Sequence, residues 1–354
     1  MLALERDMEK RVTNCCLLRF LTAFMPILIV VGLLTGCISG GPQWSIQDPY
    51  SSVDWTRHHQ YKANFHTHTT MSDGGETPQA VIDRYRELGY AILSLTDHDT
   101  MSPEHATWPW LAFERDPESI GMVAVEGSEI LHKHHIGSYF NDYSDPRIDS
   151  EDIALEEIGR RSGLSVLFHP GRYNRPVDWY TGMYRIYPHL IGIEIYNQGD
   201  RYFGDRKTWD AILTEIATER PVWGFSNDDM HDPKTQLGHN WNIMLLPELS
   251  SEWVRRGMMN GMFFFVYAPL GHDGPIPPVI RSITVNSQKG TIHIDVPDYE
   301  SIEWISEGKV VHRGDRVSLS ELPSLGGYIR AVIHAADSGS VVGTQPFRIQ
   351  PLTK

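Results

Sequence analysis

Residues 62–99 read KANFHTHTTMSDGGETPQAVIDRYRELGYAILSLTDHD, two apolar runs separated by one amphipathic stretch. The runs 62–66 and 91–95 have the length and residue types of buried strands. The stretch 78–88 has helical spacing, with Thr77 before it as a helix-capping residue and Pro78 in its first turn. Both apolar runs end in polar residues, HTH and TDHD. The segment therefore predicts a strand–helix–strand unit whose strands end in potential metal ligands.

The same alternation of short apolar runs and amphipathic stretches continues to about residue 270. Further strand-like runs occupy residues 122–125, 136–140, 165–168, 191–195 and 222–225. Further helix-like stretches occupy residues 151–161, 208–218 and 250–259. Such alternation predicts an α/β fold with a mostly parallel sheet. Seven strands favour a barrel-like closure over an open sheet, and we place this domain at residues 61–270.

The pattern changes at residues 271–280, which contain GHDGPIPP and read as a linker. Beyond it, residues 281–354 contain apolar runs of period two separated by turn residues. This pattern predicts a small all-β domain, sandwich-like in architecture. The segment has few histidines and no acidic cluster, so we expect the chemistry to lie in residues 61–270.

The N-terminal segment has the features of an export signal. Residues 19–37 read RFLTAFMPILIVVGLLTGC, a basic start followed by an apolar run that is short for a membrane span. Its end, LTGC, resembles a bacterial lipobox, which implies a signal peptide at residues 1–36, lipidation of Cys37 and a tether at residues 37–60. An uncleaved anchor helix is the alternative. Both interpretations predict an exported protein held on a membrane; the lipobox without a following aspartate favours the outer membrane.

Composition narrows the functional classes. The net charge of −14 argues against an extended surface for nucleic acid. Thirteen of the 17 histidines lie between His58 and His239. Cysteines occur only at positions 15, 16 and 37, so the body has no thiolate metal site. An anionic substrate would need local positive charge, which bound divalent metals can supply.

Imidazoles and carboxylates gather at the ends of the predicted strands. Residues two apart on a strand share a face, so His66 and His68 can reach one ion. Active sites of β/α barrels lie at the carboxyl ends of their strands. A single buried histidine is usually part of the core, and a charged cluster is usually a solvated face, but about five strand ends with the same residue types favour a metal site. Imidazole and carboxylate ligands without sulfur suit Zn, Mn or Fe.

The blocks HTH…SDG, TDHD, GSE, HxxxxF, HPGR and D-x-H, in this order over about residues 61–265, resemble the PHP (polymerase and histidinol phosphatase) superfamily. The resemblance implies a distorted seven-stranded β/α barrel, two or three divalent metal ions, and a bridging role for Glu129. The ligands that it implies are His66, His68, Asp73, His98, Glu129, His135, His169, Asp229 and His231. The last block is FSNDDMH where the family usually has GSDAH, so Asp228 competes with Asp229. Glu126 competes with Glu129, and His134 with His135.

The predicted reaction is hydrolysis of a phosphate ester of a small substrate by metal-activated water. Arg172 is expected to bind phosphate oxygens, or else to form a surface ion pair. Asn197 and Asn227 are candidate substrate contacts. Asp97 and Asp99 can orient ligand imidazoles or cap a helix, and Asp99 is also a candidate acid for the leaving group. The alternatives are a phosphodiesterase or exonuclease, a metal hydrolase of amides or lactones, and a binding lipoprotein with a decayed site.

Overall fold

The computed structural model describes residues 43–101, 107–147 and 149–352. The predicted signal peptide 1–36 and lipidation site Cys37 lie outside them. None of the described helices combines the length and apolar character that a membrane crossing requires. The tether prediction for residues 37–60 is wrong in its second part. Strand β1 (Gln43–Gln47) belongs to the body, because the buried side chains of Tyr50 and Val53 fix the segment that follows it in the core.

The first sheet starts from three parallel strands, β2 (His59–Asn64), β3 (Tyr90–Leu93) and β4 (Val123–Ala124). Strands β10 (Asn240–Leu246) and β11 (Phe263–Tyr267), which the sequence did not predict, continue it antiparallel beyond β2. Helix α1 (Pro78–Glu87) joins β2 to β3, and α5 (Ser251–Asn260) joins β10 to β11. The predicted cap is confirmed, since the Thr77 side chain accepts from the amide of Ala80.

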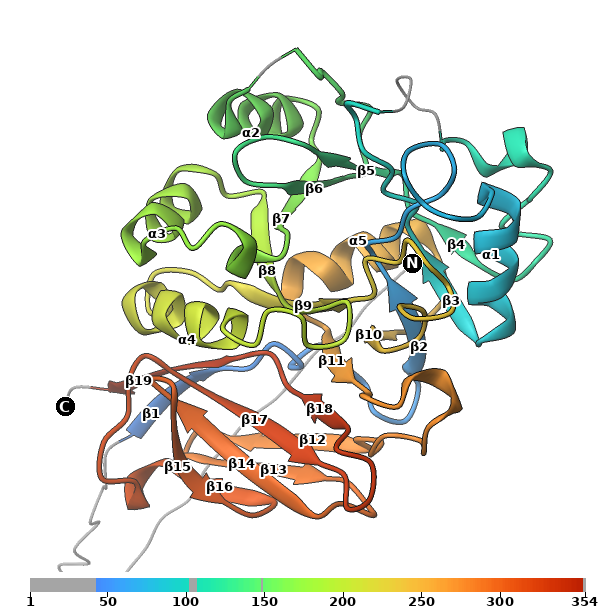
Figure 1. Ribbon diagram of the computed structural model, residues 1–354. Coiled ribbons are helices and arrows are strands. Elements are labelled where there is room, and N and C mark those ends of the chain that lie inside the picture. The colour runs from blue at the N-terminus through green and yellow to red at the C-terminus, as the bar shows by residue number, and fades with distance from the viewer. Residues whose placement is uncertain (1–42, 102–106, 148, 353–354) are drawn as a thin grey trace, which may run out of the picture. The chain divides into compact units, whose positions relative to one another are not determined.

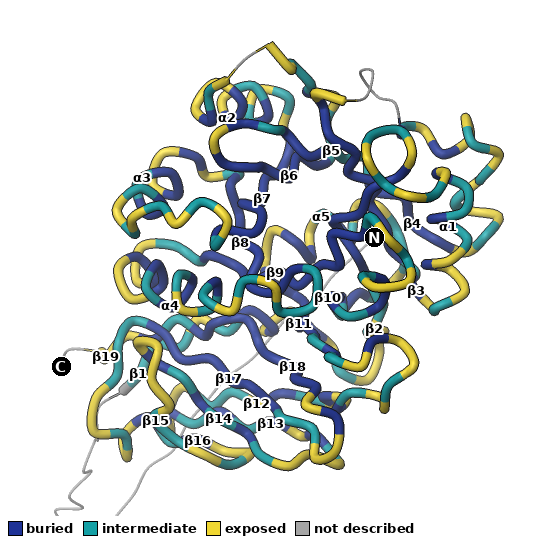
Figure 2. The backbone as a smooth tube through the Cα atoms, viewed as in Figure 1, coloured by how far each residue is buried: buried dark blue, intermediate teal, exposed yellow. Residues whose placement is uncertain are grey.

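The second sheet has the order β5 (Gly127–Ile130), β6 (Ile136–Tyr139), β7 (Leu164–Leu167), β8 (Leu190–Asn197), β9 (Trp223–Asn227). Its last two pairings are parallel. Helices α2 (Glu151–Arg160), α3 (Val177–Ile186) and α4 (Asp205–Ile216) pack outside it (Figure 1), and α3 is another element the sequence did not predict. Every residue of β8 is buried (Figure 2), so polar groups on it must find partners inside the protein.

The predicted closure into a barrel is wrong, although the α/β class is confirmed. The two sheets meet at isolated backbone bridges, Thr67 with Met230 and His98 with Glu129. Between β9 and β10 a side chain takes the place of a ladder: the amide of Asn242 accepts from the N–H of Ser226 at 3.1 Å and donates to its carbonyl at 2.8 Å. Because an amide side chain fills this gap, the two backbones stay too far apart to pair directly.

The C-terminal residues are all β apart from one 3₁₀ turn, as predicted. Strands β12 (Ser282–Asn286), β13 (Thr291–Asp295) and β16 (Arg316–Ser318) form a separate antiparallel sheet. The others extend the first sheet: β14 (Ser301–Ser306), β15 (Lys309–Arg313), β17 (Tyr328–His334), β18 (Val341–Gly343) and β19 (Phe347–Leu352). Since β18 pairs with β11 and β1 pairs with β19, the predicted linker 271–280 does not separate two independent sheets.

Candidate metal centre

Segments that follow β2 and β9 lie side by side at the carboxyl ends of these strands. The amide of His68 donates to the carbonyl of Met230 at 2.9 Å, and the amide of Asp229 donates to the carbonyl of His66 at 2.9 Å. These two bonds bring the HTH block against the DDMH block. The S-D-G turn packs directly against the HTH block. This close approach requires glycine at residue 74, because a side chain there would lie 2.5 Å from the backbone of His68.

Glu129 occupies the middle of the cluster and is 1% exposed. Its Oε1 lies 2.7 Å from Nδ1 of His135 and 3.1 Å from Nε2 of His169. Its Oε2 lies 3.0 to 3.2 Å from ring nitrogens of His66, His68 and His98. One carboxylate therefore faces two sets of imidazoles with its two oxygens, which is the geometry of a bridging ligand.

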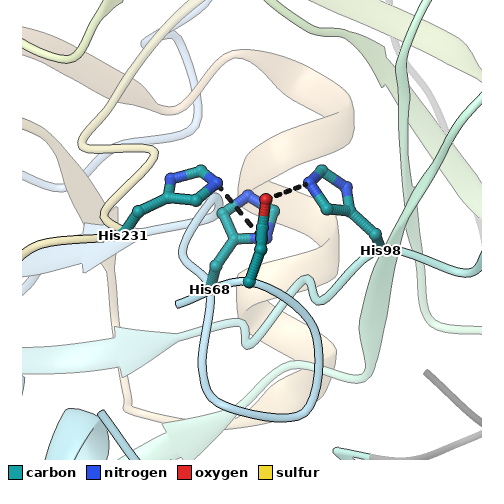
Figure 3. Close-up of side chains that lie close together, drawn as sticks. His68, His98 and His231 are labelled. Carbon is teal, nitrogen blue, oxygen red and sulfur yellow. Dashed lines mark ion pairs between the residues drawn. The ribbon is translucent and has the colours of Figure 1, made fainter. Parts of the chain in front are cut away.

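Asp73 and Asp229 extend the cluster on either side of His68. Asp73 lies 3.3 Å from His98 and from His231, and Figure 3 shows the imidazoles of His68, His98 and His231 drawn together. Oδ1 of Asp229 lies 3.2 Å from Nε2 of His66 and 3.1 Å from Nε2 of His68. The described residues thus hold three overlapping groups that can each bind an ion: His68, Asp73, His98 and His231; His66, Glu129 and His169; His66, His68 and Asp229.

These distances are those of ligands that share a metal ion, and they are also within the range of hydrogen bonds. Ligands about 2.0 to 2.2 Å from one ion lie about 3 Å apart. The Nε2 atoms of His66 and His68 are 3.1 Å apart, and two such lone pairs repel unless a proton or a cation lies between them. Oδ1 of Asp229 is buried, and it lies within 3.2 Å of these same two ring nitrogens. The donor set, nitrogen and oxygen without sulfur, fits Zn, Mn or Fe.

Two of the candidate ligands have left-handed backbone conformations, with φ of +30° at His169 and +47° at Asp229. Such conformations cost about 1–3 kcal/mol each at residues other than glycine, and they persist only where the surroundings fix them. Here the amide of His169 donates to Oε2 of Glu194 at 2.9 Å, and the amide of Asp229 is held by His66. Strain at two members of one cluster is typical of a functional site.

The structure brings all nine residues implied by the resemblance into one cluster, and it separates the competing pairs. Glu129, not Glu126, is the carboxylate among the five imidazoles. His134 belongs to the core: it stacks on Trp179, and burial lowers its pKa to about 3. Asp228 accepts three backbone N–H groups, from Gly238, His239 and Asn240. It therefore anchors the loop before β10 instead of facing the cluster.

The titration of the cluster follows from its charges. Burial lowers the pKa of His68, but hydrogen bonds and charges from Asp229 and Glu129 outweigh it and raise this pKa to about 9. The same balance raises the pKa of His66 well above its usual value. Burial raises the pKa of Glu129 less than the charge of His66 and the bonded histidines lower it. Protons thus occupy His66 and His68 of the metal-free cluster near neutral pH, and an arriving cation must displace them.

This balance predicts opposite pH trends for stability and metal affinity. The pKa of His68 is raised from 6.5 to about 9 on folding, so its contribution to stability is full below pH 6.5 and is lost as the pH rises to about 9. Urea unfolding of the metal-free protein should show this loss relative to a His68→Gln variant. Apparent metal affinity should rise over the same pH window. If the unfolding free energies of the two proteins changed equally with pH, the raised pKa assigned to His68 would be contradicted.

Glu194, in the middle of the apolar strand β8, is a site residue to which the sequence analysis gave no role. It is fully buried. Its Oε1 lies 2.9 Å from Nδ1 of His66 and accepts from Nδ2 of Asn227 at 2.9 Å. Its Oε2 accepts from the amide of His169 and from Asn197. Glu194 therefore orients His66 so that Nε2 faces the cluster.

We expect Glu194→Gln to weaken metal binding by about 10- to 100-fold, the usual effect of removing a carboxylate that orients a ligand imidazole. Competition with a chelator measures it. The half-buried Glu157→Gln, on α2 and outside the cluster, serves as the control. Equal affinities in the two variants would show that His66 needs no such partner.

The acidic residues beside His98 have structural contacts. Asp97 accepts from the amide and hydroxyl of Thr69 and of Ser72, and so fixes the loop that carries Asp73. Asp99 is 3% exposed, and its Oδ1 accepts from the amide of Leu131 at 2.9 Å. Asp99 is not among the residues that line the cleft, so its position does not support the predicted role as acid for the leaving group. Its bond to Leu131 supports a structural role instead.

The two asparagines predicted to contact substrate form hydrogen bonds inside the protein instead. Asn227 is fully buried, and both ends of its amide are bonded, to Glu194, Phe65 and Asn242, so its assignment to substrate is wrong. Asn197 is also buried and donates to Oδ2 of Asp229 at 3.2 Å, which makes it a support for that ligand instead. Both errors have one cause: an asparagine at a strand end reads the same whether it faces the cleft or the core.

Arg172 does line the cleft above the cluster, is exposed, and forms no ion pair within the described residues. The cleft measures about 470 Å³. Arg201, which the sequence did not point to, lines the same cleft and donates to Oε1 of Gln198 at 2.7 Å. Gln198 in turn donates to the backbone and the carboxylate of Asp229. Two guanidinium groups thus stand beside the candidate metal ligands.

Comparison with known proteins supports the fold. No family model and no curated protein matches the sequence. The chain is similar in structure to a two-domain protein from Bacteroides vulgatus that contains a predicted PHP-like metal-dependent phosphoesterase, at 16% identity and a TM-score of 0.52, over 88% of this chain and 91% of that one. This likeness shows a shared fold over most of both chains.

Weaker matches include an amidohydrolase from Chromobacterium violaceum, at 17% identity and a TM-score of 0.37 over 50% of this chain and 90% of that one. A lesion-specific endonuclease from Pyrococcus furiosus matches at 14% identity and a TM-score of 0.43, over 57% of this chain and 56% of that one. Their activities differ, and at these scores neither match bears on the chemistry of this chain.

Proposed function

We propose that this protein is a metal-dependent hydrolase that cleaves phosphate esters of small substrates. The observation that carries the proposal is Glu129, whose two oxygens face two separate sets of imidazoles at the floor of a cleft that also contains Arg172 and Arg201. The resemblance to the PHP superfamily agrees with it. The fold shared with the Bacteroides vulgatus protein agrees with it as well.

The nine clustered residues would hold two or three divalent ions. Bound there, such ions would lower the pKa of water so that hydroxide is available as a nucleophile near neutral pH, and they would offset the charge that develops on phosphate. The chain's own residues then bind and orient the substrate. Arg172 and Arg201 can each donate to phosphate oxygens, and Gln198 holds Arg201 beside Asp229. Asp99 keeps the Leu131 end of the cleft in place.

Purified protein without the export signal tests the proposal. Elemental analysis of bound metal should give two or three equivalents of Zn, Mn or Fe. The same sample should hydrolyse nitrophenyl phosphate monoesters or diesters, and a chelator should abolish this activity. Metal without hydrolysis of any ester, but with hydrolysis of amides or lactones, would replace the proposal. No metal after reloading would refute it.

Arg172→Gln should raise the KM for phosphate esters by about 10- to 100-fold, the effect of losing a hydrogen bond from a charged group worth about 1.5–3 kcal/mol. Arg201→Gln should act in the same direction. Arg160→Gln, an exposed arginine on α2 that pairs with Glu157, is the matched control. Steady-state kinetics on metal-loaded protein measures the effect, and unchanged KM values in both cleft variants would remove these arginines from substrate binding.

We also propose export with a lipid on Cys37 and attachment to the outer membrane. The proposal rests on the LTGC block and on the apolar run before it. Labelling of cells with a fatty-acid probe should mark the protein, and Cys37→Ser should abolish the label. If the Cys37→Ser protein still carried the fatty-acid label, lipidation at Cys37 would be contradicted.

A further inference from the structure

Strand β9 carries the FSNDD block toward the metal centre, and its two edges are bonded in different ways. One edge pairs in parallel with β8. On the other edge, two side-chain amides bond the backbone. Gln345 accepts from the N–H of Gly224 at 2.8 Å and donates to its carbonyl at 2.9 Å. Asn242 makes the same two bonds to Ser226. Each amide thus imitates one residue of a neighbouring strand.

Gln345 comes from the C-terminal part of the chain, between β18 and β19, and is fully buried. Its own backbone is fixed: its N–H donates to the hydroxyl of Tyr50 at 2.8 Å. The preceding residue, Thr344, is bound on both sides to Ala331 of β17. The side chain therefore reaches β9 from a rigid base.

Other residues also pack closely against β9 at residue 224, which is glycine. A side chain there would lie 2.8 Å from Ile195 and 2.9 Å from the ring of Trp209. Beyond the contact, Asn227 accepts from the amide of Phe65, and the amide of Asp229 donates to His66. A shift of β9 along its axis would move Asp229 relative to both histidines of the HTH block.

We infer that Gln345 is a positioning residue for the metal centre. By completing the free edge of β9, it holds Asp229 in register with His66 and His68. The segment between β18 and β19 is therefore part of the support of the site. The inference rests on the proposed function only in that the cluster must bind metal.

Gln345→Met tests it, with Thr344→Val as the matched control. Gln345→Met removes two buried hydrogen bonds to β9, whereas Thr344→Val removes one, from the amide of Ala331 on β17 to the Thr344 hydroxyl. Gln345→Met should weaken metal binding by about 10- to 100-fold in competition with a chelator. It should also speed hydrogen exchange at the amides of Gly224 and Ser226. Thr344→Val should lower the urea midpoint by a similar amount. Its metal affinity and its exchange rates at Gly224 and Ser226 should stay within about twofold of those of the unaltered protein.

Gln345→Glu adds a test that does not depend on the folding of the methionine variant. A protonated carboxyl has a donor and an acceptor in the places of the amide, so it can restore both bonds to Gly224. The metal affinity of Gln345→Glu, divided by that of the unaltered protein at the same pH, should therefore rise as the pH falls.

Equal losses of affinity in Gln345→Met and Thr344→Val, or unchanged exchange at Gly224, would overturn the inference and leave Gln345 as a stabiliser of the interface. If the unaltered protein binds no metal, the proposed function fails. Exchange at Gly224 still reports whether Gln345 holds β9.

Discussion

Glu129→Gln should reduce ester hydrolysis by about 10³-fold or more, equivalent to about 4 kcal/mol of transition-state stabilisation. The reason is geometric. The two oxygens of Glu129 lie within 3.2 Å of five imidazoles, and no other carboxylate of the cluster faces both sets. An amide keeps the volume but loses the charge that offsets the bound cations. We therefore expect metal content to fall to one equivalent or less while the fold persists.

Elemental analysis, circular dichroism and hydrolysis kinetics on one sample would check this result. Glu126→Gln is the control, since it changes a nearby glutamate that the cluster does not use as its centre. Full metal content and activity in Glu129→Gln would show that the histidines and Asp229 suffice, and the bridging assignment would fall.

Asp210→Ala should cost about 3–5 kcal/mol of unfolding free energy, the usual penalty for removing one partner of a buried ion pair. Asp210, on α4, accepts from Nε and Nη2 of Arg330 at 2.9 and 2.7 Å and from the hydroxyl of Tyr328 at 2.8 Å. The Arg330 side chain is only 3% exposed. Without Asp210, its guanidinium stays buried above the ring of Trp209 with no counter-charge.

Urea unfolding measures this cost, and Glu219→Ala gives the comparison. Glu219 pairs with Arg185 at similar distances, but both side chains are about half exposed, so its loss should cost about 0–1 kcal/mol. Replacing Asp210 and Arg330 together by leucine and methionine should recover much of the loss. A cost below about 1 kcal/mol for Asp210→Ala would mean that water reaches the pair after the change.

The metal cluster was predictable because its ligands lie in short blocks at strand ends, where local sequence and chain direction fix the side chains. Glu194 carried a signal as well, since a charged residue inside the apolar run GIEIY must have a buried partner. What the sequence could not supply was the identity of that partner. His66 is far away in the chain, and only the parallel order of the strands brings it close.

The errors in the predicted fold also arise from partners that lie far away in the chain. A run such as 240–246 reads NWNIMLL, and its asparagines argue against a central strand. In the structure these asparagines bond β9, which explains both the missed strand and the open barrel. Helix α3 was missed because its aromatic residues and flanking prolines do not give a clear helical pattern. The predicted tether contains β1 because its partner, β19, lies at the other end of the chain.

The pairing of β1 with β19 also sets the order in which the chain can fold. Residues 43–47 pair with residues 348–352, so this part of the sheet has to wait for a contact of very long sequence separation. Until then β11 lacks β18, and the edge of β9 lacks Gln345. Exposed strand edges favour association between chains. A folding chain should therefore depend most on protection from aggregation until β18 and β19 have joined the sheet.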